Sequence, residues 1–113
     1  MLYNLIRAGK CVPFVTVALL LLATPGHSQQ DGATLFKSKC AACHGPDGKG
    51  ETAMGKALKI RNLGSPEVQS QSDAQLTEIV TKGKNKMPAF DGKLSKEQIT
   101  ALVAYVRDFG KKH

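Results

Sequence analysis

The sequence of 113 residues contains no tryptophan, and aromatic residues of all kinds make up only 5% of it. Its three cysteines are too few for a disulfide-dense secreted scaffold. No internal repeat is present, and no segment shows the alternation of apolar and polar residues that is typical of a half-buried strand. A chain this short holds one small domain at most, so a multidomain enzyme and a multi-span membrane protein are excluded.

The first quarter of the chain has the pattern of an export signal. Residues 1–10 carry two basic side chains and no acidic one, and residues 11–23 are almost entirely apolar. The apolar run is shorter than the roughly 18–20 residues that span a bilayer. Residues 24–28 are polar and rich in turn formers. We therefore predict a signal peptide over 1–28, cleaved to leave a periplasmic domain over 29–113 without a membrane span; an uncleaved anchor is the alternative.

After residue 28 the sequence predicts helices and loops. Asp31 can cap a helix over residues 32–39. Ser72 with Gln75, and Ser95 with Gln98, fit capping boxes that begin two further helices. An N-cap serine followed by proline predicts a further short helix from residue 66 to about 69. The predicted helices cover residues 32–39, about 66–69, from 73 to Gly83, and from 96 to 109 with Gly110 just past the end. Residues 51–63 are expected to be mostly irregular, with a short helix as the alternative, and 85–93 to be a loop.

A compact cysteine motif lies directly after the first predicted helix: Cys40-Ala-Ala-Cys43-His44. Cys-x-x-Cys-His is the attachment signature of c-type haem. The two thiols would form thioethers with the two vinyl groups of the porphyrin, and the adjacent His44 could then coordinate the iron. The sequence therefore predicts one haem c, covalently bound through Cys40 and Cys43. An all-α fold of three to five helices would wrap around it.

Three alternatives to haem remain open for the cysteine pair. A thioredoxin-like redox pair needs a βαβ setting, and no strands are predicted. A structural zinc site needs four ligands, and the only other histidines are His27, in the predicted signal, and the terminal His113. A plain disulfide between residues three apart would close a very small loop and so remove little entropy from the unfolded chain.

Met87 is the predicted ligand for the second axial position of the iron. This residue precedes Pro88, which stiffens the loop and biases Met87 to an extended backbone. Met54 is only ten residues beyond His44, which makes the opposite face of a haem hard to reach, and His113 lies at a fraying end. The predicted metal ligands are therefore His44 and Met87, with no catalytic residue.

These segments together resemble the small class I c-type cytochromes, a group that includes bacterial periplasmic carriers and algal and cyanobacterial photosynthetic carriers. The resemblance covers essentially residues 31–110, including the stretches 40–50, 83–90 and 94–106. It implies a compact cytochrome c fold, contact of Gly32 and Phe36 with the face near Tyr105, and axial ligation by His44 and Met87. Partners of the haem propionates cannot be assigned, although Arg61 and Asn62 are candidates.

Filled axial positions favour electron transfer over catalysis, because no site is left for oxygen or peroxide. We therefore expect a monomeric, non-enzymatic carrier of single electrons. The net charge is +7, or +5 without residues 1–28, and five lysines flank the two haem-contact segments in sequence: Lys37, Lys39, Lys82, Lys84 and Lys86. They would steer redox partners with acidic docking surfaces, or simply form a solvated surface. No nucleic-acid motif is present.

Three other functions remain as alternatives, and the sequence separates the first of them poorly from a free carrier. A cytochrome subunit of a larger periplasmic dehydrogenase or oxidase would do the same chemistry inside a complex. A haem enzyme or ligand sensor would need an open or labile sixth position on the iron. A thiol–disulfide protein would carry no covalent haem at Cys40 and Cys43.

Overall fold

The computed structural model describes Gly9 and residues 31–112, and the regular secondary structure within them is helical. Six helices follow one another: α1 (Gly32–Lys39), α2 (Ala41–His44), α3 (Ala53–Ala57), α4 (Pro66–Gln69), α5 (Asp73–Lys82) and α6 (Lys96–Gly110). The predicted all-α class is confirmed. Of the predicted signal peptide, only Gly9 is described, so the signal and the boundary of the mature domain stay predictions. No helix in the described part of the chain is long and apolar enough to cross a membrane.

Side-chain caps begin the helices where the sequence predicted them. The Asp31 carboxylate accepts a hydrogen bond from the Thr34 backbone N–H at 2.7 Å and so opens α1. Both capping boxes are complete, at Ser72 for α5 and at Ser95 for α6. Ser65 caps α4, with proline at the first helical position. These caps are confirmed because each depends on residues three positions apart.

Two helix boundaries differ from the prediction. The segment Ala41–His44 is helical, and Cys40 lies between α1 and α2 without capping α2 through its side chain. Gly110 is the last residue of α6 rather than the first beyond it. A Cβ at Gly110 would lie 2.6 Å from Cδ of Gln69. Glycine at this position therefore lets α6 pack closely against Gln69 of α4. The sequence instead suggested that Gly110 ends the helix.

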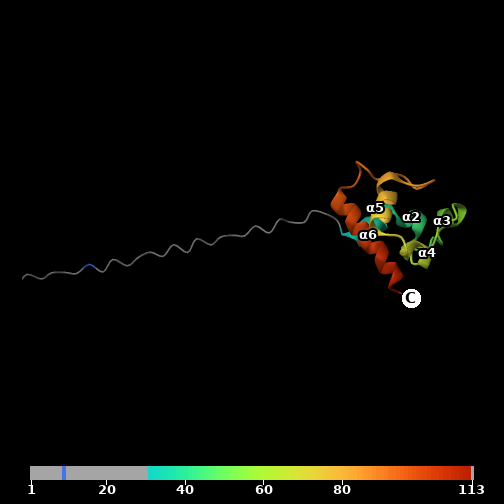
Figure 1. Ribbon diagram of the computed structural model, residues 1–113, viewed down its shortest axis with the longest axis horizontal. Helices are drawn as coiled ribbons and strands as arrows, with labels where there is room; N and C mark the ends of the chain where they lie inside the picture. Colours follow the sequence, from blue (N-terminus) through green and yellow to red (C-terminus); the bar gives the residue numbers. More distant parts are fainter. Residues whose placement is uncertain (1–8, 10–30, 113) are drawn as a thin grey trace, which may run out of the picture.

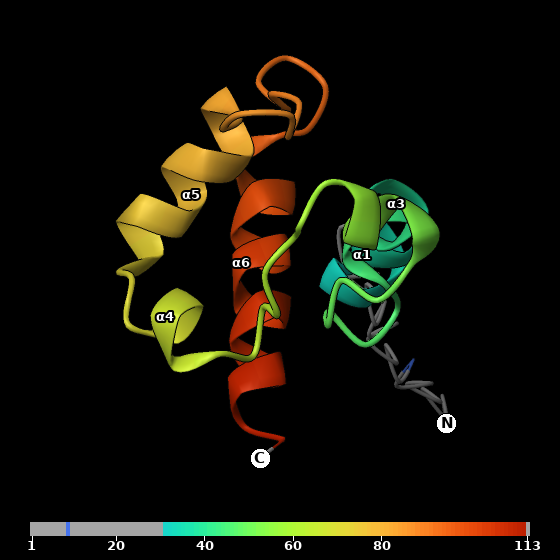
Figure 2. The same ribbon diagram turned by 90° about the vertical axis from the view of Figure 1, so that its right-hand side faces the viewer.

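The long helix α6 is the common support of the fold (Figure 1). In Figure 2 it stands in the middle, with α4 and α5 on one side and α1 and α3 on the other. We call residues 31–57, which hold α1 to α3, the His44 half, and residues 66–94, which hold α4, α5 and the following loop, the Met87 half. Helix α1 of the His44 half and helices α4 and α5 of the Met87 half contact α6, whereas α2 packs on α1 and α3. Among the described helices, none of one half packs against one of the other.

The His44 half rests on the larger core cluster, in which Leu35 and Phe36 of α1 pack with Leu102 and Phe109 of α6. The predicted contact between the first and last helices is confirmed. Gly32 lies so close to α6 that an added Cβ would collide with the carbonyl of Ala101. The Phe36 ring lies 5.2 Å, centroid to centroid, from the rings of Tyr105 and Phe109.

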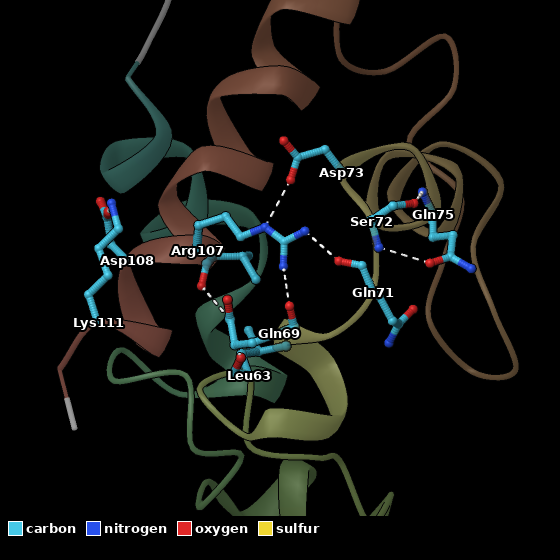
Figure 3. Close-up of polar contacts among 10 residues, drawn as sticks. Leu63, Gln69, Gln71, Ser72, Asp73, Gln75, Arg107, Asp108 and Lys111 are labelled. Atoms are coloured by element: carbon cyan, nitrogen blue, oxygen red, sulfur yellow. Dashed lines mark hydrogen bonds and ion pairs between the residues drawn. The ribbon is translucent and has the colours of Figure 1, made fainter.

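The Met87 half rests on a smaller cluster of Val68, Leu76 and Val103. Arg107 of α6 adds polar contacts, which are drawn in Figure 3. Its guanidinium donates to the carbonyl oxygen of Gln69 at 2.9 Å, to that of Gln71, and to Asp73 Oδ1 at 2.8 Å. One partly buried cation therefore holds the turn between α4 and α5 against α6. We call this set of contacts the Arg107 clamp.

Candidate functional site

The helix α2 brings the three residues of the cysteine motif into one turn. The backbone N–H groups of Cys43 and His44 both donate to the carbonyl oxygen of Cys40, at 3.2 and 2.9 Å. Cys40 and Cys43 are free thiols and half-buried, as is His44. The predicted attachment residues thus lie together, with neither cysteine engaged in a disulfide.

Burial controls the charge of this turn. It raises the pKa of the Cys40 thiol to about 11, with a smaller contribution from the nearby Cys43. Burial also lowers the pKa of His44 below its usual value. At neutral pH, Cys40 is therefore a neutral thiol and His44 a neutral imidazole, which is the form that coordinates metals. These donors fit a covalently attached, histidine-ligated haem.

The imidazole of His44 also has an unsatisfied atom. Its Nδ1 is buried and has no hydrogen-bond partner among the described residues. The ring lies beside the aromatic cluster, with its centroid 6.3 Å from that of Phe36. A buried polar nitrogen without a partner is costly in a folded protein. The arrangement is therefore what a ring prepared for a ligand would show, rather than a histidine satisfied within the core.

Two neighbouring segments hold the motif in place. The Thr52 hydroxyl lies 2.9 Å from the Ala42 carbonyl oxygen and 3.1 Å from that of Cys43, and it accepts from the Gly55 N–H at 2.9 Å. It therefore ties the end of α2 to the beginning of α3. On the other side, the Gly50 N–H donates to the His44 carbonyl oxygen at 2.7 Å. The loop after His44 is thus folded back on the motif.

Met87 lies in the Met87 half, in the loop that follows α5. Its side chain is half-buried, while the flanking Lys86 and Pro88 are exposed. The described structure therefore holds the two predicted axial ligands on different halves that meet on α6. Met54 lies on α3, in the same half as His44, and is 52% exposed. His113 lies outside the described residues.

Two of the alternatives for the cysteine pair find no support in residues 31–112. No strand of a βαβ unit is present there, and the single β-bridge joins Lys84 to Met87. No group of three or more His, Cys, Asp or Glu side chains in that part of the chain is placed to hold a metal ion. A zinc site built on these cysteines would need such a group.

Comparison with known proteins identifies a family. A family model described as "Cytochrome C oxidase, cbb3-type, subunit III" matches residues 27–106. Cytochrome c6 of Thermosynechococcus vestitus is 41% identical over 98 residues, which cover 83% of this chain and 84% of that protein. The cbb3-type cytochrome c oxidase subunit FixP of Bradyrhizobium diazoefficiens is 36% identical over 89 residues, but these make up only 29% of its length.

A solved structure agrees with these relatives. The c-type cytochrome KustC0563 superposes with a TM-score of 0.66 and 36% sequence identity, covering 71% of this chain and 98% of that one. The chain therefore matches nearly the whole of a c-type cytochrome, and the matched fold includes the part of this chain that carries Cys40 and Cys43.

Sequence reasoning missed several residues that organise this site. Thr52 fell in a stretch expected to be irregular, and a threonine in such a stretch carries no signal of its partner. Arg107 lies in a predicted helix outside its apolar stripe, and nothing in the sequence distinguished it from other polar residues there. Its partners are separated from it by more than 30 residues, so no local pattern marks them.

Proposed function

The chain belongs to the cytochrome c family, and from this premise we propose that it carries single electrons between redox partners. One haem c would be attached through Cys40 and Cys43 and axially ligated by His44 and Met87. The observation that carries the proposal is the α2 turn, which presents two free thiols and a neutral imidazole with an unpartnered buried nitrogen. The half-buried Met87 supplies a sulfur donor from the opposite half.

The chemistry follows from this set of donors. When bound, the haem iron supplies one-electron exchange between Fe(II) and Fe(III), and a histidine–methionine ligand pair raises its reduction potential. Met87 closes the position that oxygen or peroxide would otherwise take, so it favours transfer over catalysis. The aromatic cluster at Phe36, Tyr105 and Phe109 keeps water from one side of His44. Rigid surroundings without water would keep the reorganisation energy of electron transfer small when the charge of the iron changes.

The partners would be proteins with acidic docking surfaces, met by the chain as a monomer in the periplasm. Support comes from the charge of the sequence and from five exposed lysines near the two ligand segments: Lys37, Lys39, Lys82, Lys84 and Lys86. Only Lys82 among them forms an ion pair in the described structure, with Glu78 at 3.1 Å. The others keep their full charge available for steering, and association rates should fall as salt rises.

A second candidate is the same chemistry inside a larger complex. The matching family model and FixP are both named as oxidase subunits. This chain corresponds to under a third of FixP and spans 84% of a cytochrome c6. Co-purification of the haem-loaded chain with a large partner would favour this second candidate.

Visible spectra of the haem-loaded protein test the proposal. Wild type should show sharp low-spin bands when reduced, the Met–iron charge-transfer band when oxidised, and no binding of carbon monoxide. Met87→Ala should lose the charge-transfer band and bind carbon monoxide. Met54→Ala is the matched control, since it removes an exposed thioether on α3, and its spectra should equal those of wild type.

Two results would contradict the proposal. A wild-type protein that is high-spin, or that binds carbon monoxide, has an open iron and is a ligand-binding or catalytic haem protein. A protein that attaches no haem at Cys40 and Cys43 in a competent host has no cofactor of this kind.

A further inference from the structure

Two described residues hold a left-handed backbone without being glycine: Lys59, with φ of 53°, and Asn85, with φ of 54°. Asn85 lies two positions before Met87, in the same loop. We infer that Asn85 is a positioning residue for Met87, because its turn fixes the backbone from which the thioether projects. This inference rests on the proposed function, since it takes Met87 to be an axial ligand.

Both backbone hydrogen bonds of Met87 are made with Lys84. Its backbone N–H donates to the carbonyl oxygen of Lys84 at 2.9 Å, and its own carbonyl oxygen accepts from the Lys84 N–H at 3.2 Å. Together they form an isolated antiparallel bridge. Both polar backbone groups of Met87 are therefore committed to one residue. The orientation of Met87 follows directly from the turn that joins the two.

The turn between Lys84 and Met87 consists of Asn85 and Lys86. Of these two residues only Asn85 has a positive φ. Asparagine tolerates the left-handed region better than most residues, whereas a β-branched residue is strongly disfavoured there. A residue that cannot adopt this φ would change the turn and so break the hydrogen bonds between Lys84 and Met87. Met87 would then lose the two hydrogen bonds that orient it.

The rest of the loop is held by contacts that do not involve Asn85. Gly83 ends α5 with φ of 73°, and a Cβ there would lie 2.5 Å from the Met87 carbonyl oxygen. Farther along, the N–H of Phe90 donates to the carbonyl oxygen of Val80 at 3.1 Å. The loop is thus anchored to the end of α5 on both sides of Met87. The conformation at Asn85 is the remaining local variable that sets how Met87 faces its surroundings.

Three haem-loaded variants test this role by the ferric charge-transfer band and by carbon monoxide binding to the reduced protein. Asn85→Val should lose most of the band and raise the carbon monoxide-binding fraction about tenfold or more, given the cost of a left-handed β-branched residue. Asn85→Gly accepts the same φ and should match wild type. Lys59→Val introduces the same backbone strain after α3, away from the Met87 loop, and should keep the band.

The inference is overturned if Asn85→Val keeps both the band and the closed iron, or if Lys59→Val loses the band to the same extent. Met87→Ala in the same series separates the two proposals. If Met87→Ala keeps the band, the ligand assignment fails. If Met87→Ala loses it while Asn85→Val keeps it, only the role of Asn85 fails.

A milder variant decides the case in which Asn85→Val does not fold. For Asn85→Ala, the charge-transfer band should disappear on heating well before the helical signal in circular dichroism. Loss of both signals at one temperature, as in wild type, would mean that Asn85 supports the fold as a whole and not the orientation of Met87.

Discussion

The two halves of the molecule are held on the same helix by different forces. The His44 half packs Leu35 and Phe36 against α6, and both side chains are almost completely buried. The Met87 half packs the aliphatic side chains Val68 and Leu76 against α6 and has no aromatic side chain in that cluster, and it relies in addition on the Arg107 clamp. Apolar burial is tolerant of small shifts, whereas hydrogen bonds require fixed geometry.

This difference matches the way each half would hold the haem. Attachment at the His44 half would be covalent, so that half would need only to present its residues. The Met87 half would contribute a single coordinate bond that depends on position. We therefore expect the Met87 half to loosen first on heating or in denaturant, while the His44 half keeps its packing. Three pairs of substitutions would break or sharpen this contrast.

The largest effect is expected from the core of the His44 half. Phe36→Ala should lower the free energy of unfolding by about 3–5 kcal/mol, because a large cavity opens between α1 and α6. Leu76→Ala, in the Met87 half, should cost about 2–3 kcal/mol, since a smaller side chain is removed from a less buried position. Guanidinium unfolding of the haem-loaded variants, followed by circular dichroism, measures both. An equal or reversed order would mean that the two halves do not differ as described.

A smaller and more local effect is expected from the clamp. Arg107→Gln leaves the carbonyl oxygens of Gln69 and Gln71 without their donor and should cost about 2 kcal/mol. The ion pair with Asp73 adds little, because the Asp73 side chain is 77% exposed. Amide hydrogen exchange should accelerate in α5 and stay unchanged in α1.

The matched control for the clamp is Lys111→Gln at the end of the same helix. It removes an exposed ion pair with Asp108 and should change stability by no more than about 0.5 kcal/mol. If Arg107→Gln behaves like this control, or if α1 exchanges as fast as α5, the clamp does not secure the Met87 half in particular.

The smallest effect is expected from the polar contact within the His44 half. Thr52→Val removes the hydroxyl between α2 and α3 and should cost about 1 kcal/mol. Thr52→Ser keeps the hydroxyl and should recover most of that loss. Thermal unfolding of the two variants side by side measures the difference. Equal losses in both would show that the methyl group of Thr52, rather than its hydroxyl, makes the contribution.

Features of the fold that depend on near neighbours were predictable from the sequence. The caps at Asp31, Ser72 and Ser95 involve partners three residues away, so the beginnings of α1, α5 and α6 were correct. The cysteine motif was recognised for the same reason, because its chemistry lies within five consecutive residues. Ligation by Met87 also came from its local context, and it stays a prediction until the spectra are recorded.

Features that depend on distant segments were not predictable. The role of Gly110 is set by the Gln69 side chain, and that of Arg107 by carbonyl groups of another helix. The helix α2 was missed because four residues without a capping side chain carry too little signal. For Gly110 and Arg107, the deciding interaction joins parts of the chain that a short sequence window does not contain.

The contact between α1 and α6 also has a consequence for the order of folding. These helices are the first and last of the described chain, and they share the larger core. Core formation must therefore wait until almost the entire chain has been synthesised, and it must close a long loop, which slows folding. During that delay Cys40, which begins the turn that carries Cys43, lacks the packing against the larger core that it has in the finished protein. The topology thus provides an interval in which the thiols are open to modification, and docking of the last helix ends it.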